Sequence, residues 1–261
     1  MIYIFEITYP GSRLVGLDRD WAWKAEQAIR ELETPVVDAA LALSMFEAEQ
    51  NRPFPSHDSE KWQRDAERRQ HLEAEISQQL SVDRYDWDSY ERIRTAADLI
   101  SKREKWAAGQ LPRSYEGRFV FIHARSYLLA LDRFDRSLQA FAEMDDVPDT
   151  VKKAPERLES ILANLRAVRN SVAHHEDRSR GLLRPGKHLD LKPIDNQLIN
   201  APHGGVLVLE GLMNNRFGSV MADGHYGEVE ISPTVLGQVR DLLQDVINSF
   251  DWDGPPRHEP Y

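Results

Sequence analysis

An arginine, an asparagine and a histidine lie close together in the segment Arg169–His174, whose sequence is RNSVAH. A histidine titrates near neutral pH and can move a proton on or off a ribose 2′-hydroxyl or a leaving oxygen. An arginine offers a planar fork of donors to phosphate oxygens. Asn170 can hold the imidazole ring or a phosphate oxygen. Arg169, Asn170 and His174 therefore predict cleavage of RNA without a metal or cofactor, because the 2′-hydroxyl would act as nucleophile.

The spacing of arginine and histidine is a weak signal when taken alone. The same spacing occurs at Arg52/His57, in a proline-containing loop, and at Arg118/His123, which encloses four apolar residues. A packed core histidine is the simplest interpretation of His123. Only Arg169/His174 has a polar residue directly after the arginine, at the end of a predicted helix within a basic segment. This pair is therefore the candidate site.

Helical geometry predicts how the candidate residues are oriented. At about 100° per residue, one face of the helix collects the apolar side chains and meets the core. These side chains are Leu158, Ile161, Leu162, Leu165, Val168 and Val172. Asn170 and His174 point away from that face, beside Ala163 and Ala167, and Arg169 lies at its boundary. A face of small residues with two polar ones indicates that another helix or subunit approaches closely there and covers a polar pocket.

The charge distribution favours an anionic ligand at this segment. The chain has a net charge of −10, which argues against a protein that coats duplex DNA. Between Lys152 and Lys192, however, ten Lys/Arg stand against five Asp/Glu, a local charge of +5. We expect the substrate to be bound by four residues there: His175, Arg166, Arg178 and Arg184. The plainer interpretation of these charges is a solvated helix face.

The motif also resembles that of a known family. Arg169-Asn170-x-x-x-His174 is similar to the Arg-polar-x-x-x-His motif of HEPN domains, and the flanking residues 165–175 look like those of defence and toxin members. The resemblance implies a helical bundle over residues 87–177, paired as a homodimer whose two motifs share a cleft. It implies a metal-independent endoribonuclease acting as a toxin or antiviral effector, with Arg169 and His174 catalytic and Asn170 supporting. It leaves open an antitoxin or nucleotidyltransferase partner.

Two other functions remain open. One is a non-catalytic helical module that binds RNA, a nucleotide or a partner protein through the same basic surface. The other is a structural subunit in which Arg169 pairs with an acid and the motif only packs the dimer. A metal site at residues 175–177 is disfavoured, because consecutive helical side chains diverge. The glycine–lysine spacing in residues 181–188 lacks the Ser/Thr and the flanking strand and helix of a phosphate-binding loop.

The periodicity of apolar residues predicts a mainly α single domain over residues 1–261, with a short N-terminal strand at residues 2–8. Pro35 is expected to mark a break or a first helical turn. The predicted helices cover residues 18–46, 58–80, 87–106, 113–144 and, after a turn at residues 145–149, 150–176.

The C-terminal part, residues 189–250, is predicted as a β-meander followed by a closing helix. The expected strands are 206–212, 218–221 and 228–231, with turns at residues 214–215 and 223–224. The helix covers 234–250, and the Pro-rich tail after Asp253 is expected to be loose. The chain has no cysteine, which fits a reducing compartment. Its N-terminus lacks a basic leader, and no apolar stretch reaches the length of a membrane span. We therefore expect a cytoplasmic protein that does not contact membranes.

Overall fold

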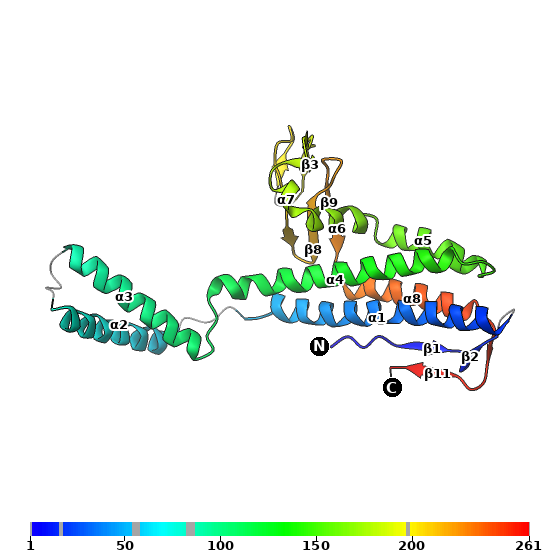
Figure 1. Ribbon diagram of the computed structural model, residues 1–261, viewed down its shortest axis with the longest axis horizontal. Helices are drawn as coiled ribbons and strands as arrows, with labels where there is room; N and C mark the ends of the chain where they lie inside the picture. The colour runs from blue at the N-terminus through cyan, green and yellow to red at the C-terminus, as the bar shows by residue number, and fades with distance from the viewer. Residues whose placement is uncertain (1, 16–17, 54–57, 82–86, 197–198, 261) are drawn as a thin grey trace. The chain divides into compact units, whose positions relative to one another are not determined.

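The computed structural model describes residues 2–15, 18–53, 58–81, 87–196 and 199–260. Its described part is mainly helical, with several small antiparallel sheets. The chain divides into two compact units (Figure 1). The first comprises Met1–Gln50 together with Val120–Tyr261, and the second comprises Asn51–Phe119.

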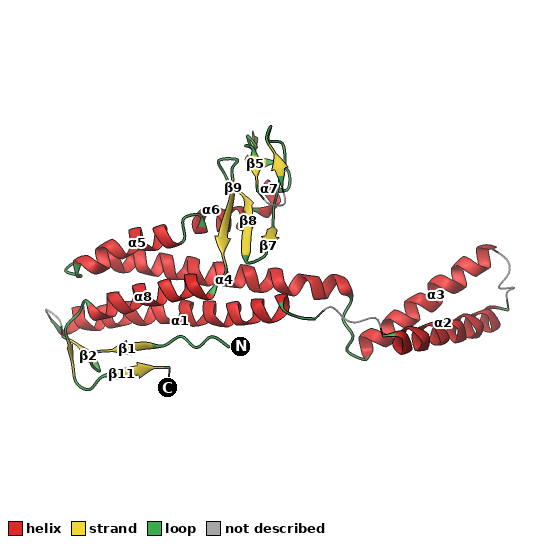
Figure 2. Cartoon of the chain, turned by 180° about the vertical axis from the view of Figure 1, so that it is seen from behind, coloured by secondary structure: helices red, strands yellow, loops and turns green. Residues whose placement is uncertain are grey.

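The first unit is built on a bundle of long helices. The helices α1 (Arg19–Gln50), α4 (Arg113–Ala142, from Val120 on), α5 (Asp149–Ile161) and α8 (Pro233–Asn248) run alongside one another (Figures 1 and 2). Each helix repeats apolar residues every three or four positions, so each has one face to bury. These faces meet in a single core that includes Phe46, Phe134 and Leu243, each with no measurable exposure.

The membership of the bundle differs from the expected range of residues 87–177. The helix α3 (Trp87–Ala107) belongs to the second unit, whereas α1 and α8, which lie outside that range, contribute buried residues to the main core. The periodicity of a helix indicates which of its faces is buried, but it does not indicate which other helix covers that face. The choice of neighbours is therefore a property of the tertiary structure.

Pro35 does not break the first helix, so that prediction is wrong. The helix α1 continues from Arg19 to Gln50 with Pro35 inside it. A proline in a helix interior removes one backbone hydrogen bond and crowds the preceding turn, at a cost of about 3 kcal/mol. Leu32 and Val36 flank Pro35 and are fully buried. Burial of the apolar side chains around the proline offsets the local cost.

The predicted helix over residues 150–176 is divided into three. The helix α5 ends at Ile161, α6 covers Leu165–Ala173, and the single turn α7 covers His175–Arg178. Asn164 precedes α6 with a backbone conformation outside the helical region. Asparagine competes with helical hydrogen bonding, which explains why the chain turns there.

The predicted β-meander is confirmed, with shifted boundaries. The strands β7 (Gly211–Met213), β8 (Arg216–Val220) and β9 (Tyr226–Glu230) form an antiparallel sheet, with Phe217 opposite Val229. This sheet packs against α6. The predicted turn at residues 214–215 is present, and Asn214 adopts a positive φ of 54° there. The closing helix α8 begins at Pro233 after the N-cap Ser232, whose Oγ accepts from the Val235 amide.

Two further strand pairs precede the meander. The strand β3 (Leu182–Arg184) pairs with β4 (Lys187–His188), and β5 (Ile194–Asp195) pairs with β6 (Asn200–Ala201). The first pair covers the segment with the glycine–lysine spacing, which is therefore a hairpin and not a strand-to-helix phosphate loop.

The C-terminal tail is ordered, in contrast to the prediction of a loose end. The strand β11 (Arg257–Glu259) pairs with β1 (Ile7–Tyr9), and β10 (Trp252–Asp253) pairs with β2 (Arg13–Leu14). Of the strand predicted over residues 2–8, only the C-terminal end forms, as part of β1. The buried Tyr9 ring meets the Trp252 ring edge-on at 5.2 Å, and the Arg257 guanidinium lies 4.3 Å from the Tyr9 ring centre. These contacts hold the tail.

The second unit is a pair of helices with its own small core. The helices α2 (Ser59–Leu80) and α3 pack side by side around Leu72, Ile76, Ile93 and Ala97. Ion pairs join them, with Arg68 Nη2 lying 2.6 Å from Glu104 Oε1. Both helices agree closely with the predicted ranges. In the described part of the chain, no helix combines the length and apolar character needed to cross a membrane.

Stability should depend on pH through Glu33, which accepts a hydrogen bond from the Tyr9 hydroxyl. Burial and the nearby charge of Glu259 raise the pKa of Glu33 to about 7, against the opposing effect of Arg257. The folded chain therefore holds a proton that the unfolded chain has released between about pH 4.5 and 7. Its free energy of unfolding should fall as the pH rises through this window.

Urea unfolding at pH 5 and pH 8 measures this effect. Between these pH values the free energy of unfolding of the wild type should fall by on the order of 1 kcal/mol more than that of Glu33→Gln, after allowance for the partial exposure of Glu33. Glu31→Gln, on the exposed side of α1, is the matched control and should parallel the wild type. Equal pH dependence in Glu33→Gln and wild type would contradict the assignment.

Candidate functional site

The helix α6 carries the candidate residues and turns one face into the core. Leu165 and Val168 are buried there, as the helical geometry predicts. Asn170 lies on the exposed side, and His174 follows the last helical residue, with its backbone amide donating to the Asn170 carbonyl at 3.0 Å. The predicted orientation of Asn170 and His174, away from the core, is therefore correct.

Arg169 faces α4 and not the solvent. Its Nη2 lies 2.8 Å from Asp132 Oδ1, and the two side chains are only 16% and 10% exposed. The alignment is poor, because Asp132 Oδ1 and Arg169 Nε are both buried without a hydrogen-bond partner among the described residues. Asp132 also pairs with Arg136, whose Nε lies 3.0 Å from Oδ2. Burial, partly opposed by Arg136, raises the pKa of Asp132.

A second pair lies beside the first. The guanidinium of Arg166 donates to Asp135 from Nε at 2.5 Å and from Nη2 at 2.9 Å, while Asp135 itself is buried. Two acids three residues apart on α4 thus meet two arginines three residues apart on α6. We call Asp132, Asp135, Arg166 and Arg169 the α4–α6 charge lattice. Arg166, expected to bind substrate, is already engaged by Asp135.

The sequence signal for this lattice is a pair of acids in an apolar helix, and the Arg169–His174 motif does not reveal it. Asp132 and Asp135 interrupt the most apolar part of the long helix α4, between Leu131, Phe134 and Leu138. An acid on a buried helix face requires a cation, because an unpaired buried charge is strongly unfavourable. The excess of arginines between Lys152 and Lys192 indicates where that cation comes from.

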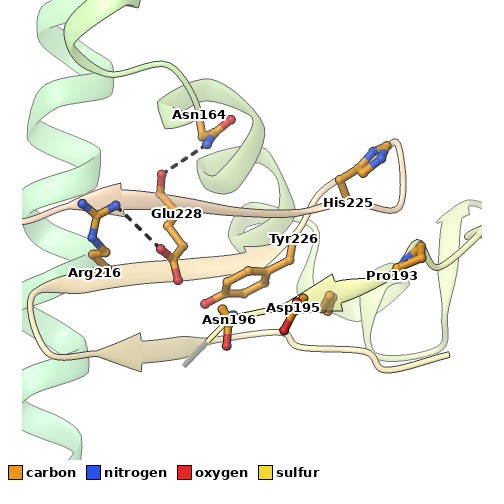
Figure 3. Close-up of a pocket in the computed structure, with 9 residues that line it drawn as sticks. Asn164, Pro193, Asp195, Asn196, Arg216, His225, Tyr226 and Glu228 are labelled. Atoms are coloured by element: carbon orange, nitrogen blue, oxygen red, sulfur yellow. Dashed lines mark hydrogen bonds and ion pairs between the residues drawn. The ribbon is translucent and has the colours of Figure 1, made fainter. Parts of the chain in front are cut away.

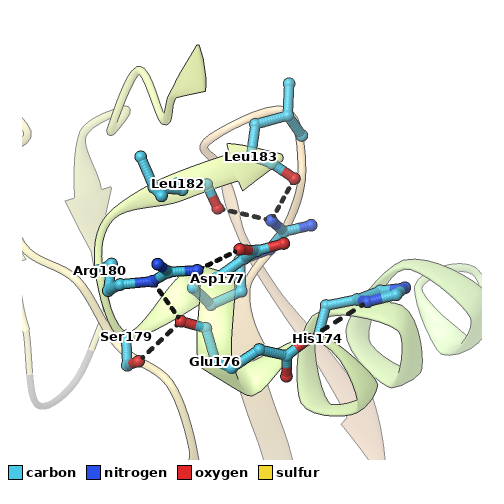
Figure 4. Close-up of polar contacts among 8 residues, drawn as sticks. His174, Glu176, Asp177, Ser179, Arg180, Leu182 and Leu183 are labelled. Carbon is cyan, nitrogen blue, oxygen red and sulfur yellow. Dashed lines mark hydrogen bonds and ion pairs between the residues drawn. The ribbon is translucent and has the colours of Figure 1, made fainter. Parts of the chain in front are cut away.

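The His174 side chain is open to solvent. It is 62% exposed, and its Nδ1 lies 3.9 Å from Glu176 Oε1 (Figure 4). The neighbouring His175 is exposed as well. The motif predicts a guanidinium and an imidazole that are accessible together. Within one chain they are not, because Arg169 is held against Asp132 whereas the His174 ring faces solvent.

Arg178, also expected to bind substrate, is buried instead. It is 4% exposed, and its Nη1 donates to the carbonyl oxygens of Leu182 and Leu183 at 2.7 Å each. These bonds fasten the strand β3 to α7 (Figure 4). Arg178 therefore positions the β3–β4 hairpin and is not available to a ligand. Arg180 closes the same turn by donating to the Glu176 carbonyl and the Asp177 carboxylate.

The hairpin presents exposed cations next to α7. Arg184, Lys187 and His188 are all exposed, and Gly186 makes the tight turn between the strands with a φ of +77°. In the described ranges of the chain, neither Arg184 nor Lys187 forms an ion pair. We call His174, His175, Arg184, Lys187 and His188 the hairpin basic group. Of the four predicted substrate-binding residues, His175 and Arg184 remain accessible.

None of the known protein-family models, curated proteins or solved structures that were compared with this chain matches it. In the part of the chain that the structure describes, no group of three His, Asp or Glu side chains is arranged to hold a metal ion.

The α4–α6 charge lattice predicts that Arg169 stabilises the fold. Arg169→Ala leaves Asp132 with the exposed Arg136 and the charge of Arg166, which is already paired with Asp135, so the free energy of unfolding should fall by about 2–3 kcal/mol. Arg133→Ala is the matched control on the neighbouring helix: Arg133 pairs at 3.4 Å with Glu31, both more than half exposed, and its loss should cost at most about 1 kcal/mol. Urea unfolding measures both variants. Equal, small losses would show that Arg169 has no structural role.

Proposed function

We propose that this chain is a HEPN-like module that binds single-stranded RNA through the hairpin basic group. The observation that carries this proposal is the accessibility of Arg184 and Lys187, which are exposed and without an ion pair in the described ranges. They lie on the hairpin whose strand β3 contacts α7, and the exposed His174 and His175 stand at the start of α7. Cations without acidic partners are those that gain most from phosphate oxygens. The arginine of the motif, in contrast, is already neutralised by Asp132.

The chemistry of the surface favours RNA in a single-stranded form. The chain as a whole carries −10, so a duplex that spreads phosphates over a wide area meets repulsion beyond the basic segment. A single strand can place a few phosphates at the hairpin and leave its bases free for other contacts. The imidazoles of His174 and His175 add hydrogen-bond donors and acceptors at the same end of α6.

Cleavage of RNA is the second candidate, and the exposure of His174 favours it. In this reaction the ribose 2′-oxygen attacks phosphorus and the bond to the 5′-oxygen breaks, which leaves a 2′,3′-cyclic phosphate and a 5′-hydroxyl. His174 would remove the 2′-proton or protonate the leaving oxygen. Because Arg169 of each copy is held against Asp132, a symmetric dimer would bring together two exposed His174 side chains, and the hairpin cations Arg184 and Lys187 would have to supply the positive charge. Such an activity would suit a toxin or an antiviral defence effector.

The salt dependence of RNA binding tests the first proposal. The probe is a short labelled oligouridylate, and the measured quantity is the slope of log Kd against log salt concentration. This slope should be smaller by about 1.4 in the double variant Arg184→Ala/Lys187→Ala than in the wild type, because two phosphate contacts are removed. The double variant Lys152→Ala/Lys153→Ala removes the same charge from exposed positions on α5 and should keep the wild-type slope. Identical slopes in both double variants would refute binding at the hairpin.

A cleavage assay in EDTA separates the two candidates. Mixed-sequence RNA that stays intact while it binds supports the binding module. RNA that is cut by the wild type and at least about 100-fold more slowly by His174→Ala supports the nuclease. His71→Ala, an exposed histidine in the second unit, controls for a contaminating nuclease and should behave as wild type.

A further inference from the structure

A polar pocket beside the start of α6 has its tyrosine and its glutamate paired with each other. It lies between that helix, the strands β8 and β9, and the segment 193–196, and its volume is about 350 Å³ (Figure 3). Burial and the carboxylate of Glu228 raise the pKa of Tyr226, so the phenol stays protonated and donates a hydrogen bond to Glu228. These two side chains therefore satisfy each other within the protein.

A larger pocket lies within the second unit. Its volume is about 890 Å³, which is in the range of small-ligand sites, about 300–1,000 Å³. The helices α2 and α3 lie side by side there (Figures 1 and 2). The start of α2, the end of α3 and the segment 109–116, which leads into α4, line the pocket.

The two helices contribute the same dipeptide to the walls of this pocket. Lys61-Trp62 lines it from α2, and Lys105-Trp106 lines it from α3. The lining residues of each helix recur at intervals of three and four positions, so they share one helical face. An ion pair joins the two faces, because Lys105 Nζ lies 2.6 Å from Asp65 Oδ2.

A glycine turn places Trp106 at the end of α3. Gly109 follows that helix with a φ of +83°, a conformation that favours glycine. Its amide donates to the Trp106 carbonyl, and the Gln110 amide donates to the Lys105 carbonyl, each at 2.9 Å. These bonds end the helix and turn the chain towards α4.

The two tryptophan rings of the pocket are open to solvent. Trp62 is 69% exposed and Trp106 is 46% exposed. Within the described ranges, neither ring stacks on another aromatic ring. Tryptophan is highly buried on average, because its large apolar surface gains much from leaving water. Two exposed rings at one pocket therefore favour a flat ligand that covers them.

The pocket also carries an excess of positive charge. Among the described residues, five Lys/Arg and three Asp/Glu line it. Of the acids, Asp65 is paired with Lys105, and Asp58 accepts the Lys61 backbone amide at 2.9 Å as the N-cap of α2. The third acid, Glu116, forms no ion pair in the described ranges. The acids thus leave most of the positive charge uncompensated.

Three cations of the pocket are open to an anion. Lys61 and Arg113 are exposed and form no ion pair with the described residues. Lys102 is exposed as well, and its Nζ lies 3.6 Å from Oδ2 of the exposed Asp98, a pairing that contributes little in water. Arg52, by contrast, already interacts within the protein. Phosphate oxygens are the ligands that such cations bind best.

We propose that this pocket binds a nucleotide, with its base on the two tryptophan rings and its phosphate on Lys61, Lys102 and Arg113. A nucleotide joins a flat aromatic base to an anionic phosphate, which are the two features that the pocket matches. Every base has a π-face, so stacking accepts any of them. An acidic peptide would also meet the cations, but its aliphatic side chains would find few apolar partners: besides the tryptophans, these are Leu111 and Pro112.

The nucleotide pocket goes beyond the proposed function. It lies in the second unit and includes no residue of the hairpin basic group. The two sites can therefore be tested separately.

Calorimetric titration of the full chain with adenosine 5′-monophosphate (AMP) tests the pocket. AMP should bind saturably, whereas adenosine, without the phosphate, and ribose 5-phosphate, without the base, should each bind at least about tenfold more weakly. Trp62→Ala and Lys61→Gln should each weaken AMP binding at least about fivefold. The matched controls are Trp87→Ala, 73% exposed at the start of α3, and Arg92→Gln, an exposed cation on that helix, and both should bind as wild type.

The outcomes distinguish this inference from the proposed function. Failure of AMP to bind, equal binding of adenosine or ribose 5-phosphate, or unchanged affinity in Trp62→Ala would each overturn the nucleotide pocket. A short Glu-rich peptide that binds in place of AMP, and not to Trp62→Ala, would overturn it as well. The double variant Arg184→Ala/Lys187→Ala should bind AMP as wild type.

That double variant also separates the two failures. AMP binding with an unchanged oligouridylate salt slope in the variant removes only the proposed RNA function. A reduced slope in the variant, without AMP binding by the wild type, removes only the nucleotide pocket.

Discussion

The pairing of two buried carboxylates on α4 with two arginines on α6 constrains the rest of the site. Asp132 and Asp135 lie in the core-facing surface of the long bundle helix α4, where an unpaired charge would cost several kcal/mol. Arg169 and Arg166 supply the compensating charges and thereby fix the rotation of α6 against the bundle. Because Arg169 turns inward, the opposite side of the helix, with Asn170 and His174, turns to solvent.

This arrangement divides the motif between two tasks. Stabilisation of a transition state requires a cation whose charge is available where negative charge develops, and the charge of Arg169 is already offset by Asp132. The exposed His174 stands at the start of α7. The buried Arg178 fastens to α7 the β3–β4 hairpin, which carries a different set of cations. A single chain thus presents accessible cations on the hairpin, whereas the arginine of the motif is already paired.

The two ends of α6 differ in the sign of their charge. At its C-terminal end stand imidazoles and unpaired cations, and at its N-terminal end stands a pocket with the carboxylates of Glu228 and Asp195. Anions are therefore favoured at the C-terminal end of α6, and cations or hydrogen-bond donors at its N-terminal end. The short meander that packs on α6 provides both the pocket and the support for the helix.

Local patterns in the sequence determined the helices α2, α3, α4 and α8, the meander with its turn at residues 214–215, and the outward orientation of Asn170 and His174. Apolar periodicity, caps and turn residues act between near neighbours, so one sequence suffices to find them. Only the tertiary structure decided that Asp132 captures Arg169, that α1 runs through Pro35, that the tail pairs with β1, and that Glu228 and Tyr226 share a pocket. Asp132 and Arg169, the tail and β1, and the segments that line the pocket are distant from one another in the sequence. Periodicity indicates a buried face without indicating what covers it.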